Sequence, residues 1–109
     1  MAQSLVEINF KLTVSGAEYE QAVAPLAQTV ADVDGLQWKI WLLNEQAHEA
    51  GGVYLFADGD SARAFLDRSL VAQVKSAPIL SDFRTAQFDL IDNLTAITHG
   101  PVAETMRGA

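Results

Sequence analysis

The residues of this sequence best suited to chemistry on a small molecule fall in one stretch, residues 36–56. His48 stands beside Glu49, and an imidazole that a carboxylate orients can accept a proton near neutral pH. Trp38 and Tyr54 can supply flat apolar walls, and the tyrosine adds a phenolic hydrogen bond. These residue types suit the binding and deprotonation of a planar hydroxylated molecule. The simpler interpretations are a solvated loop histidine and aromatic side chains that only pack.

The same stretch has the pattern of two β-strands joined by a short loop. Side chains alternate between the two faces of a strand, so Trp38 and Trp41 must point to opposite sides. We expect Leu43 to pair with Glu49 across a five-residue loop, which places Trp38 opposite Tyr54. This register is a hypothesis, and it determines which side chains share a face.

The predicted register gives the strand pair two unlike faces. One face resembles a core and consists of Leu36, Trp38, Ile40, Leu42, Ala50, Gly52, Tyr54 and Phe56. The other face mixes charged and apolar side chains, namely Gln37, Lys39, Trp41, Leu43, Glu49, Gly51, Val53 and Leu55. This second face holds more apolar surface than a small monomer usually leaves in water. We therefore expect Trp41, Val53 and Leu55 to lie in an interface between two copies of the chain.

The composition restricts the classes of function. A length of 109 residues with 50% hydrophobic content favours one compact domain over residues 1–109. There is no cysteine and only two histidines, His48 and His99, so we expect no disulfide framework and no metal site of thiolate or histidine ligands. A net charge of −7 disfavours nucleic acid and anionic membranes as partners. The sequence lacks a signal-peptide pattern and any apolar run long enough to span a bilayer, so we expect a soluble cytoplasmic protein.

Periodicity predicts the elements on either side of the central strands. Residues 5–14 alternate as a half-buried strand, and residues 17–33 have a helical spacing that Pro25 either kinks or begins. A second helix follows a turn at residues 58–60 and ends at Ala77-Pro78. The apolar stripe of that helix consists of Ala62, Phe65, Leu66, Leu70 and Val74.

The last predicted strand covers residues 82–91, and residues 92–109 form a tail in which the pattern does not place His99. The order strand, helix, strand, strand, helix, strand is the ferredoxin-like βαββαβ pattern of the α+β class. In that fold both helices cover one face of a four-stranded antiparallel sheet. The other face stays exposed in a monomer, and two such faces packed together form a symmetric homodimer.

Several segments also resemble a known family. They are WKIW, the following Asn44, HEAGGVYLF, PLA in the first helix and FDLIDNLTAI near the carboxyl end. Together they resemble the YdhR-type monooxygenases of the dimeric α+β barrel superfamily, from about Val6 to about Ile97. The resemblance implies a homodimer that forms a barrel. It also implies that molecular oxygen oxidises a hydroxylated aromatic or quinol-type substrate without a metal, flavin or other cofactor.

Such a cofactor-independent oxygenase must bind a flat phenol, remove its proton and exclude water. We expect His48 and Tyr54 to be the catalytic residues, with His48 as the base. The predicted substrate-binding residues are Trp38, Phe56, Phe65 and Gly52, the last of which leaves space above the backbone.

The spacing of the two catalytic candidates restricts this hypothesis. His48 and Tyr54 are six residues apart, about 20 Å along an extended strand. Both can act on one substrate only if the Gly51-Gly52 pair forms a bulge or if they come from different subunits. Two other functions fit the same residues. One is a non-catalytic dimer that binds an apolar metabolite or serves a stress response, and the other is an isomerase or lyase that uses the base without oxygen.

Overall fold

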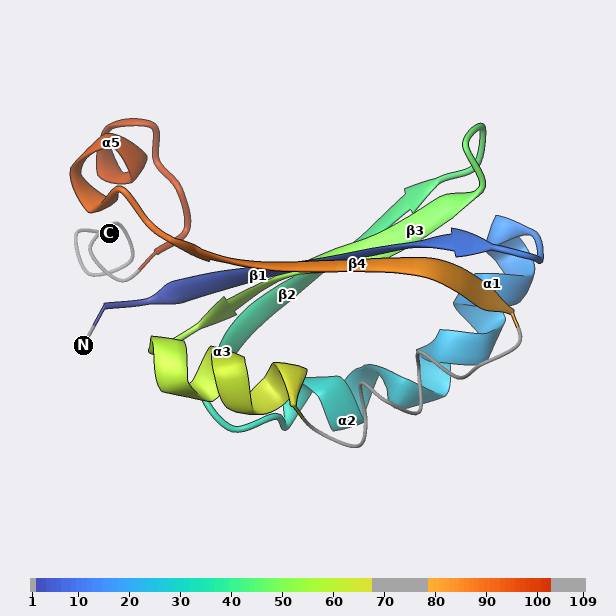
Figure 1. The fold of residues 1–109 in the computed structure, drawn as a ribbon, viewed down its shortest axis with the longest axis horizontal. Coiled ribbons are helices and arrows are strands. Elements are labelled where there is room, and N and C mark those ends of the chain that lie inside the picture. Colours follow the sequence, from blue (N-terminus) through green and yellow to red (C-terminus); the bar gives the residue numbers. More distant parts are fainter. Residues whose placement is uncertain (1, 68–78, 103–109) are drawn as a thin grey trace.

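The computed structural model describes residues 2–67 and 79–102 (Figure 1). Four strands form one antiparallel sheet in the order β2-β3-β1-β4, namely β1 (Ser4–Leu12), β2 (Leu36–Asn44), β3 (Glu49–Phe56) and β4 (Leu80–Asp89). One face of the sheet is covered by α1 (Gly16–Val23), the 3-10 turn η1 (Ala24–Leu26), α2 (Ala27–Ala31) and α3 (Gly59–Leu66). We call this face the helix side and the opposite face the reverse face. The fold is ferredoxin-like and belongs to the α+β class, as the sequence predicted.

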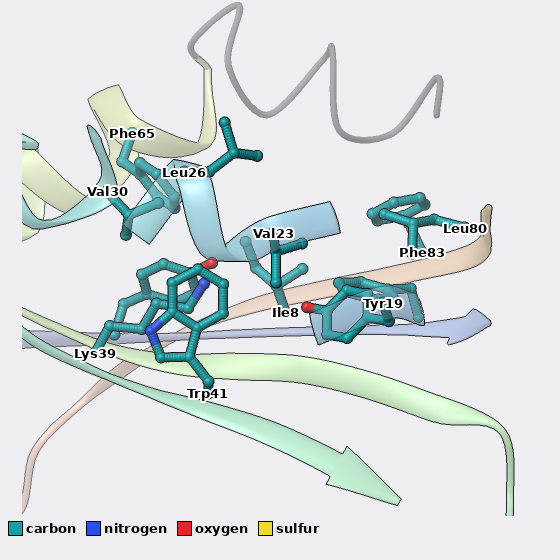
Figure 2. A pocket seen from close by; sticks show the side chains of 12 residues that line it. Ile8, Tyr19, Val23, Leu26, Val30, Lys39, Trp41, Phe65, Leu80 and Phe83 are labelled. Atoms are coloured by element: carbon teal, nitrogen blue, oxygen red, sulfur yellow. The ribbon is translucent and has the colours of Figure 1, made fainter. Parts of the chain in front are cut away.

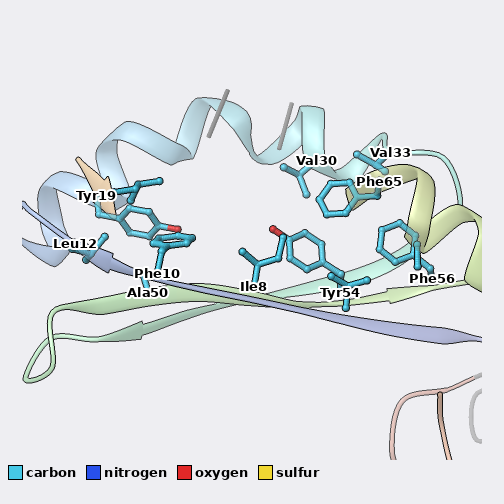
Figure 3. Packing of buried hydrophobic residues seen from close by; sticks show 13 residues of the cluster. Ile8, Phe10, Leu12, Tyr19, Val30, Val33, Ala50, Tyr54, Phe56 and Phe65 are labelled. Atoms are coloured by element: carbon cyan, nitrogen blue, oxygen red, sulfur yellow. The ribbon is translucent and has the colours of Figure 1, made fainter. Parts of the chain in front are cut away.

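The alternation of β1 positions the core. Its buried side chains all point to the helix side, and they are Ser4, Val6, Ile8, Phe10 and Leu12. Aromatic side chains from the neighbouring elements complete the cluster (Figure 3), among them Tyr19, Tyr54, Phe56 and Phe65. Burial of this apolar surface on one side of the sheet holds the helices against it.

Pro25 interrupts the first helix. α1 ends at Val23, and the chain passes through the 3-10 turn η1 before α2 resumes at Ala27. Proline has no backbone N–H and its ring clashes with the preceding turn, so a continuous α-helix cannot form here. Of the two roles predicted for Pro25, the structure shows the interruption, because a regular α-helix already precedes the proline. Gly35, with a φ of 81°, then turns the chain into β2.

The predicted register between β2 and β3 was wrong by one residue. Asn44 pairs with Glu49 where Leu43 was expected, so the loop contains only the four residues 45–48. Because side chains alternate along a strand, this shift moves the side chains from Trp38 to Asn44 to the face opposite the predicted one. Leu36, on the other side of a bulge, still pairs with Phe56 and packs against the core.

The two tryptophans do lie on opposite faces, but each lies where the other was expected. Trp41 pairs with Gly52 and lies on the helix side. Trp38 pairs with Leu55 and lies on the reverse face. In β3 the predicted alternation is correct, so Tyr54 belongs to the core under the helices.

The carboxyl-terminal segment covers one end of the reverse face. The short helix α5 (Asp92–Ile97) lies across the sheet from the other helices (Figure 1). After it, the carbonyl oxygen of Pro101 accepts a hydrogen bond from Nε1 of Trp38 at 2.7 Å, and Val102 is buried. Leu55, expected in an interface between chains, is already fully buried within the protomer.

The structure also tests the predicted bounds of the last strand and the place of His99. β4 begins at Leu80 and ends at Asp89, two residues earlier at each end than expected. His99 is exposed and has a φ of 64°. The predicted helix beyond residue 67 and its end at Ala77-Pro78 lie outside the described residues. No helix within residues 2–67 and 79–102 is long and apolar enough to cross a membrane.

Candidate functional site

A cavity of about 60 Å³ lies between the helices and the sheet (Figure 2). Its lining comes from all four strands and from α1, η1, α2 and α3. The apolar members of the lining are Ile8, Phe10, Val23, Leu26, Val30, Trp41, Phe65, Leu80 and Phe83. Three further side chains carry polar groups, and they are Lys39, Tyr19 and Tyr54.

A wider groove of about 270 Å³ adjoins this cavity along α1 and β2. Tyr19, Val23 and Trp41 line both spaces, so the indole of Trp41 stands at their boundary. An apolar cavity that binds benzene has a volume of about 150 Å³. An aromatic ligand would therefore occupy part of the groove as well as the inner cavity.

Among the described residues that line the inner cavity, Lys39 alone carries a charge. Its Nζ lies 3.3 Å from the ring centroid of Trp41 and 4.5 Å from that of Tyr54. Within the described part of the chain, no carboxylate forms an ion pair with it. Aromatic faces stabilise an ammonium group, but they replace its lost hydration only in part. Burial lowers the pKa of Lys39 to about 7, so near neutral pH a large fraction of the molecules carry a neutral amine here.

Gly52 leaves the space that the lysine side chain occupies. A Cβ at Gly52 would lie 2.6 Å from Cε of Lys39 and 3.2 Å from Cε1 of Tyr54. The aliphatic stem of the lysine thus crosses β3 at a position without a side chain. The sequence predicted open space above Gly52 for a ligand, and in the structure Lys39 fills it.

Two buried phenol groups face the same space. Tyr19 and Tyr54 are each 7% exposed, and neither hydroxyl makes a hydrogen bond to any residue that the structure describes. Both hydroxyls point toward the space above Ile8 (Figure 3). Burial raises the pKa of both phenols, so they remain protonated hydrogen-bond donors. A buried polar group without a partner costs about 1–3 kcal/mol, and a bound polar atom would offset this cost.

Only some of the predicted site residues meet at this cavity. Tyr54 and Phe65 line it, with ring centroids 4.9 Å apart. Phe56 is fully buried next to Phe65, at a centroid distance of 5.4 Å, but does not line the cavity. Trp38 is on the reverse face, because the register of β2 differs from the prediction.

The predicted base, His48, is outside both spaces. It is exposed in the turn between β2 and β3, where its φ is 53°. Glu49, its expected partner, instead forms ion pairs with Lys11 and Arg84, each at 3.1 Å. Lys11 and then Arg84 lower the pKa of the Glu49 carboxyl, while partial desolvation opposes them.

The sequence interpretation did not include Lys39, Tyr19 or Trp41 in the site. A lysine in a strand with alternating polar residues is usually solvated, and Tyr19 fitted the apolar stripe of a helix. One signal was present in the sequence, since the lysine stands between two tryptophans in β2 and a glycine pair follows in β3. That signal indicates a cavity only when the register between β2 and β3 is known, because the register decides which face Lys39 and Trp41 occupy.

The chain matches one protein family and is similar in fold to several solved structures. A family model described as "Putative mono-oxygenase ydhR" matches residues 5–101. No curated protein matches the chain.

Many solved structures share the fold, and three of them represent the range of descriptions. NE2512 from Nitrosomonas europaea, a protein of unknown function, has a TM-score of 0.67 at 17% identity, covering 84% of this chain and 91% of that one. SnoaB from Streptomyces nogalater, a cofactor-independent oxygenase, has a TM-score of 0.63 at 18% identity, covering 81% of this chain and 92% of that one. A dimeric ferredoxin-like protein of unknown function from Thermobifida fusca has a TM-score of 0.60 at 23% identity, with coverages of 83% and 93%. At these identities the similarity concerns the fold alone.

Proposed function

Because the chain belongs to the ydhR mono-oxygenase family, we propose that it oxidises a hydroxylated aromatic or quinol-type substrate in the cavity on the helix side. One observation carries this proposal. The cavity has flat apolar walls and three polar groups that form no hydrogen bond or ion pair with any described residue, the amine of Lys39 and the hydroxyls of Tyr19 and Tyr54. Apolar walls with a few convergent polar groups suit a planar molecule that carries oxygen atoms. The similarity to SnoaB, a cofactor-independent oxygenase, supports a reaction without metal or flavin.

The reaction requires a base, because a phenol gives an electron to oxygen readily only after it has lost its proton. We assign this role to Lys39, whose neutral amine accepts the phenol proton and then stays beside the phenolate as an ammonium group. Tyr19 and Tyr54 donate hydrogen bonds to a second oxygen of the substrate. The apolar lining excludes water from the anion.

The remaining steps consume molecular oxygen as the second substrate. The substrate anion transfers one electron to oxygen, and the resulting radical pair combines at the carbon para to the phenolate. The hydroperoxide so formed loses water and leaves a quinone. One oxygen atom enters the product, and the other leaves in water together with two hydrogens of the substrate.

Oxygen uptake in metal-free buffer, with a panel of naphthols, anthrones and quinols, tests this assignment. We expect Lys39→Met to lower the rate at least 100-fold, since general base catalysis contributes about 10²- to 10⁴-fold. His48→Ala is the matched control, and we expect its rate to stay within about twofold of the wild type because the imidazole is exposed outside the cavity. In the wild type, kcat/KM should rise with pH around 7, as the amine of Lys39 loses its proton.

Several outcomes contradict the proposal. A loss of activity in His48→Ala with normal activity in Lys39→Met would return the role of base to His48. Activity that requires added flavin or iron would contradict the cofactor-free reaction. Saturable quenching of tryptophan fluorescence without oxygen uptake would point to the non-catalytic binding function, and turnover without oxygen would point to an isomerase or lyase.

We also propose that two copies of the chain pair through their reverse faces. The large apolar residues exposed on this face and on the segment of α5 are Ile40, Leu42, Phe88, Ile91, Leu94 and Ile97. Val53, one of the predicted interface residues, pairs with Ile40 here. Trp41 faces the helices and is not part of this surface. The similarity to the dimeric protein from Thermobifida fusca supports the pairing.

Introducing a charge into this surface tests the pairing. Ile40 is 51% exposed, and we expect Ile40→Asp to convert a dimer at micromolar concentration into a monomer, because the new carboxylate would be buried without a partner. Thr29→Asp, an exposed position in α2, is the control and should remain dimeric. Sedimentation velocity measures both. A monomeric wild type, or a dimeric Ile40→Asp, would contradict the proposed interface.

A further inference from the structure

We propose that Lys39 is also a carbonyl-reactive amine, which condenses with the aldehyde group of a planar aromatic aldehyde in the cavity to form an imine. This activity uses the same amine as the proposed oxygenation, but it needs no oxygen and no base catalysis on a phenol. Its failure and the failure of the oxygenase proposal can therefore be observed separately.

The surroundings of Lys39 leave its nitrogen available for this reaction. Its Nζ faces the rings of Trp41 and Tyr54, and no described side chain forms a hydrogen bond or an ion pair with it. Lys11 provides the contrast within the same protein, because its Nζ lies 3.1 Å from a carboxylate oxygen of Glu49. The carboxylate engages the amine of Lys11 in an ion pair, whereas Nζ of Lys39 has the faces of two rings beside it.

Only a neutral amine has the lone pair that attacks a carbonyl carbon, and lysines in apolar pockets are activated in this way. A lysine with the ordinary pKa of about 10.4 is neutral in roughly one molecule in 2,500 at pH 7. Burial brings the pKa of Lys39 to about 7, which makes the neutral form about half of the population at that pH. A less basic amine is also a weaker nucleophile, so we expect a net gain in rate of about 100-fold over a solvated lysine.

The cavity can also support the second half of the condensation. Attack of the amine on the aldehyde carbon moves the carbonyl electron pair to oxygen. The oxygen takes up a proton and the nitrogen loses one, which gives a neutral carbinolamine. After a second protonation of the oxygen, the carbon–oxygen bond breaks and water leaves, while the nitrogen lone pair forms the C=N bond and the nitrogen loses its second proton. One aldehyde and one amine give one imine and one water, without an oxidant or a reductant.

Two features of the lining suit these steps. The hydroxyls of Tyr19 and Tyr54 have no hydrogen-bond partner in the described part of the chain. They point into the space above Ile8, where they can donate hydrogen bonds to the departing oxygen. The other described residues of the lining are apolar, which disfavours water beside the imine. The adjoining groove gives an aromatic aldehyde a route to the amine past Trp41.

Reductive trapping tests the proposal on the wild-type protein. The protein is incubated at pH 7 with 2-naphthaldehyde and sodium cyanoborohydride, and the modified lysines are identified by peptide mass spectrometry. The sequence contains three lysines, Lys11, Lys39 and Lys75, so the other two serve as internal references. We expect Lys39 to be modified about 100-fold faster than Lys11. Equal rates at Lys39 and Lys11, or a faster reaction at Lys11, would overturn the proposal.

Two controls link the reactivity to the folded cavity. In 8 M urea the preference for Lys39 should disappear, because every lysine is then solvated. Lys39→Arg keeps a positive charge but removes the nucleophile, and it should lose the fast phase of labelling while Lys11 reacts as before. A preference for residue 39 that persists in urea would show that local sequence, and not the cavity, causes it, and this result would also overturn the proposal.

Discussion

Replacing Lys39 with methionine is expected to stabilise the protein by about 1–3 kcal/mol below pH 7. A methionine has nearly the same length, keeps contact with the rings of Trp41 and Tyr54, and carries no charge that must leave water. The wild type, by contrast, holds an amine in an apolar cavity without a described carboxylate partner. A site that gains stability when its polar residue is removed is typical of a position kept for function.

The gain in stability from Lys39→Met should become smaller as the pH rises. Below pH 7 the amine of Lys39 is protonated in both the folded and the unfolded protein, so the folded state bears the full cost of the buried cation. Between pH 7 and 10.5 the folded protein has released this proton and the unfolded chain has not, so wild-type stability rises with pH across this window. The methionine variant lacks this titration. The difference in stability between the two proteins should therefore shrink as the pH rises from 7 toward 10.

Urea unfolding of both proteins at pH 6 and pH 9, followed by circular dichroism, measures this difference. Lys11→Met is the matched control, since Lys11 is partly exposed and ion-paired with Glu49. We expect a change within about 1 kcal/mol for that control. A Lys39→Met protein that is less stable than the wild type at pH 6, or a difference that does not change with pH, would contradict a buried and unpaired amine.

Alanine substitutions at the two adjacent glycines of β3 are expected to have different consequences. A Cβ at Gly51 would overlap the backbone carbonyl oxygen of Ile8 and lie 3.0 Å from Cα of Asn9. Backbone atoms of a central strand cannot move aside, so Gly51→Ala should force β1 and β3 apart. We expect a loss of about 3 kcal/mol or a failure to fold.

At Gly52 the added methyl group meets a side chain that can move. The nearest atom is Cε of Lys39 at 2.6 Å, and the lysine can swing out of the cavity toward water. Gly52→Ala should therefore fold with a loss below about 1.5 kcal/mol, raise the pKa of Lys39 and lower oxygen uptake. Urea midpoints and the titration of Lys39 compare the two variants. Equal destabilisation by both, or a Gly52→Ala protein whose Lys39 still titrates near pH 7, would contradict the role of Gly52.

The order of elements could be predicted because it depends on local patterns that agree with one another. β1 alternates without exception from Ser4 to Leu12, and Pro25 and Gly35 mark the interruption and the end of the first helical segment. The face of β3 was also predictable, since Ala50, Gly52, Tyr54 and Phe56 form one apolar set. These features are enough for the ferredoxin-like arrangement.

The site was harder to predict because β2 is apolar on both faces. Trp38, Ile40 and Leu42 share one parity, and Trp41 and Leu43 share the other, so periodicity alone does not choose between them. The choice depends on a loop of four residues, where five were expected, and on a bulge next to Leu36. Both features are set by pairing with β3.

The position of Lys39 in the cavity depends on that register, so the sequence pattern alone could not predict it. With the register shifted, the lysine and Trp41 move to the helix side, and Gly52 comes to lie beneath the lysine stem. The hydrogen bond from Trp38 to Pro101 joins residues that are 63 positions apart, and no local pattern encodes it. Tyr54 and Phe65 were therefore predictable as neighbours of the cavity, whereas the positions of Lys39 and Trp41 in its lining were not.

The protonation state of Lys39 is the property on which the oxygenase mechanism and the imine both depend. It can be measured by NMR titration of protein labelled with ¹³C at the lysine Cε, in which three resonances are expected from the three lysines. Lys39→Arg assigns the relevant resonance by its disappearance. We predict a titration midpoint near pH 7 for Lys39. A midpoint at the ordinary lysine value of about 10.4 would contradict the account, because the amine would then be protonated and solvated at neutral pH.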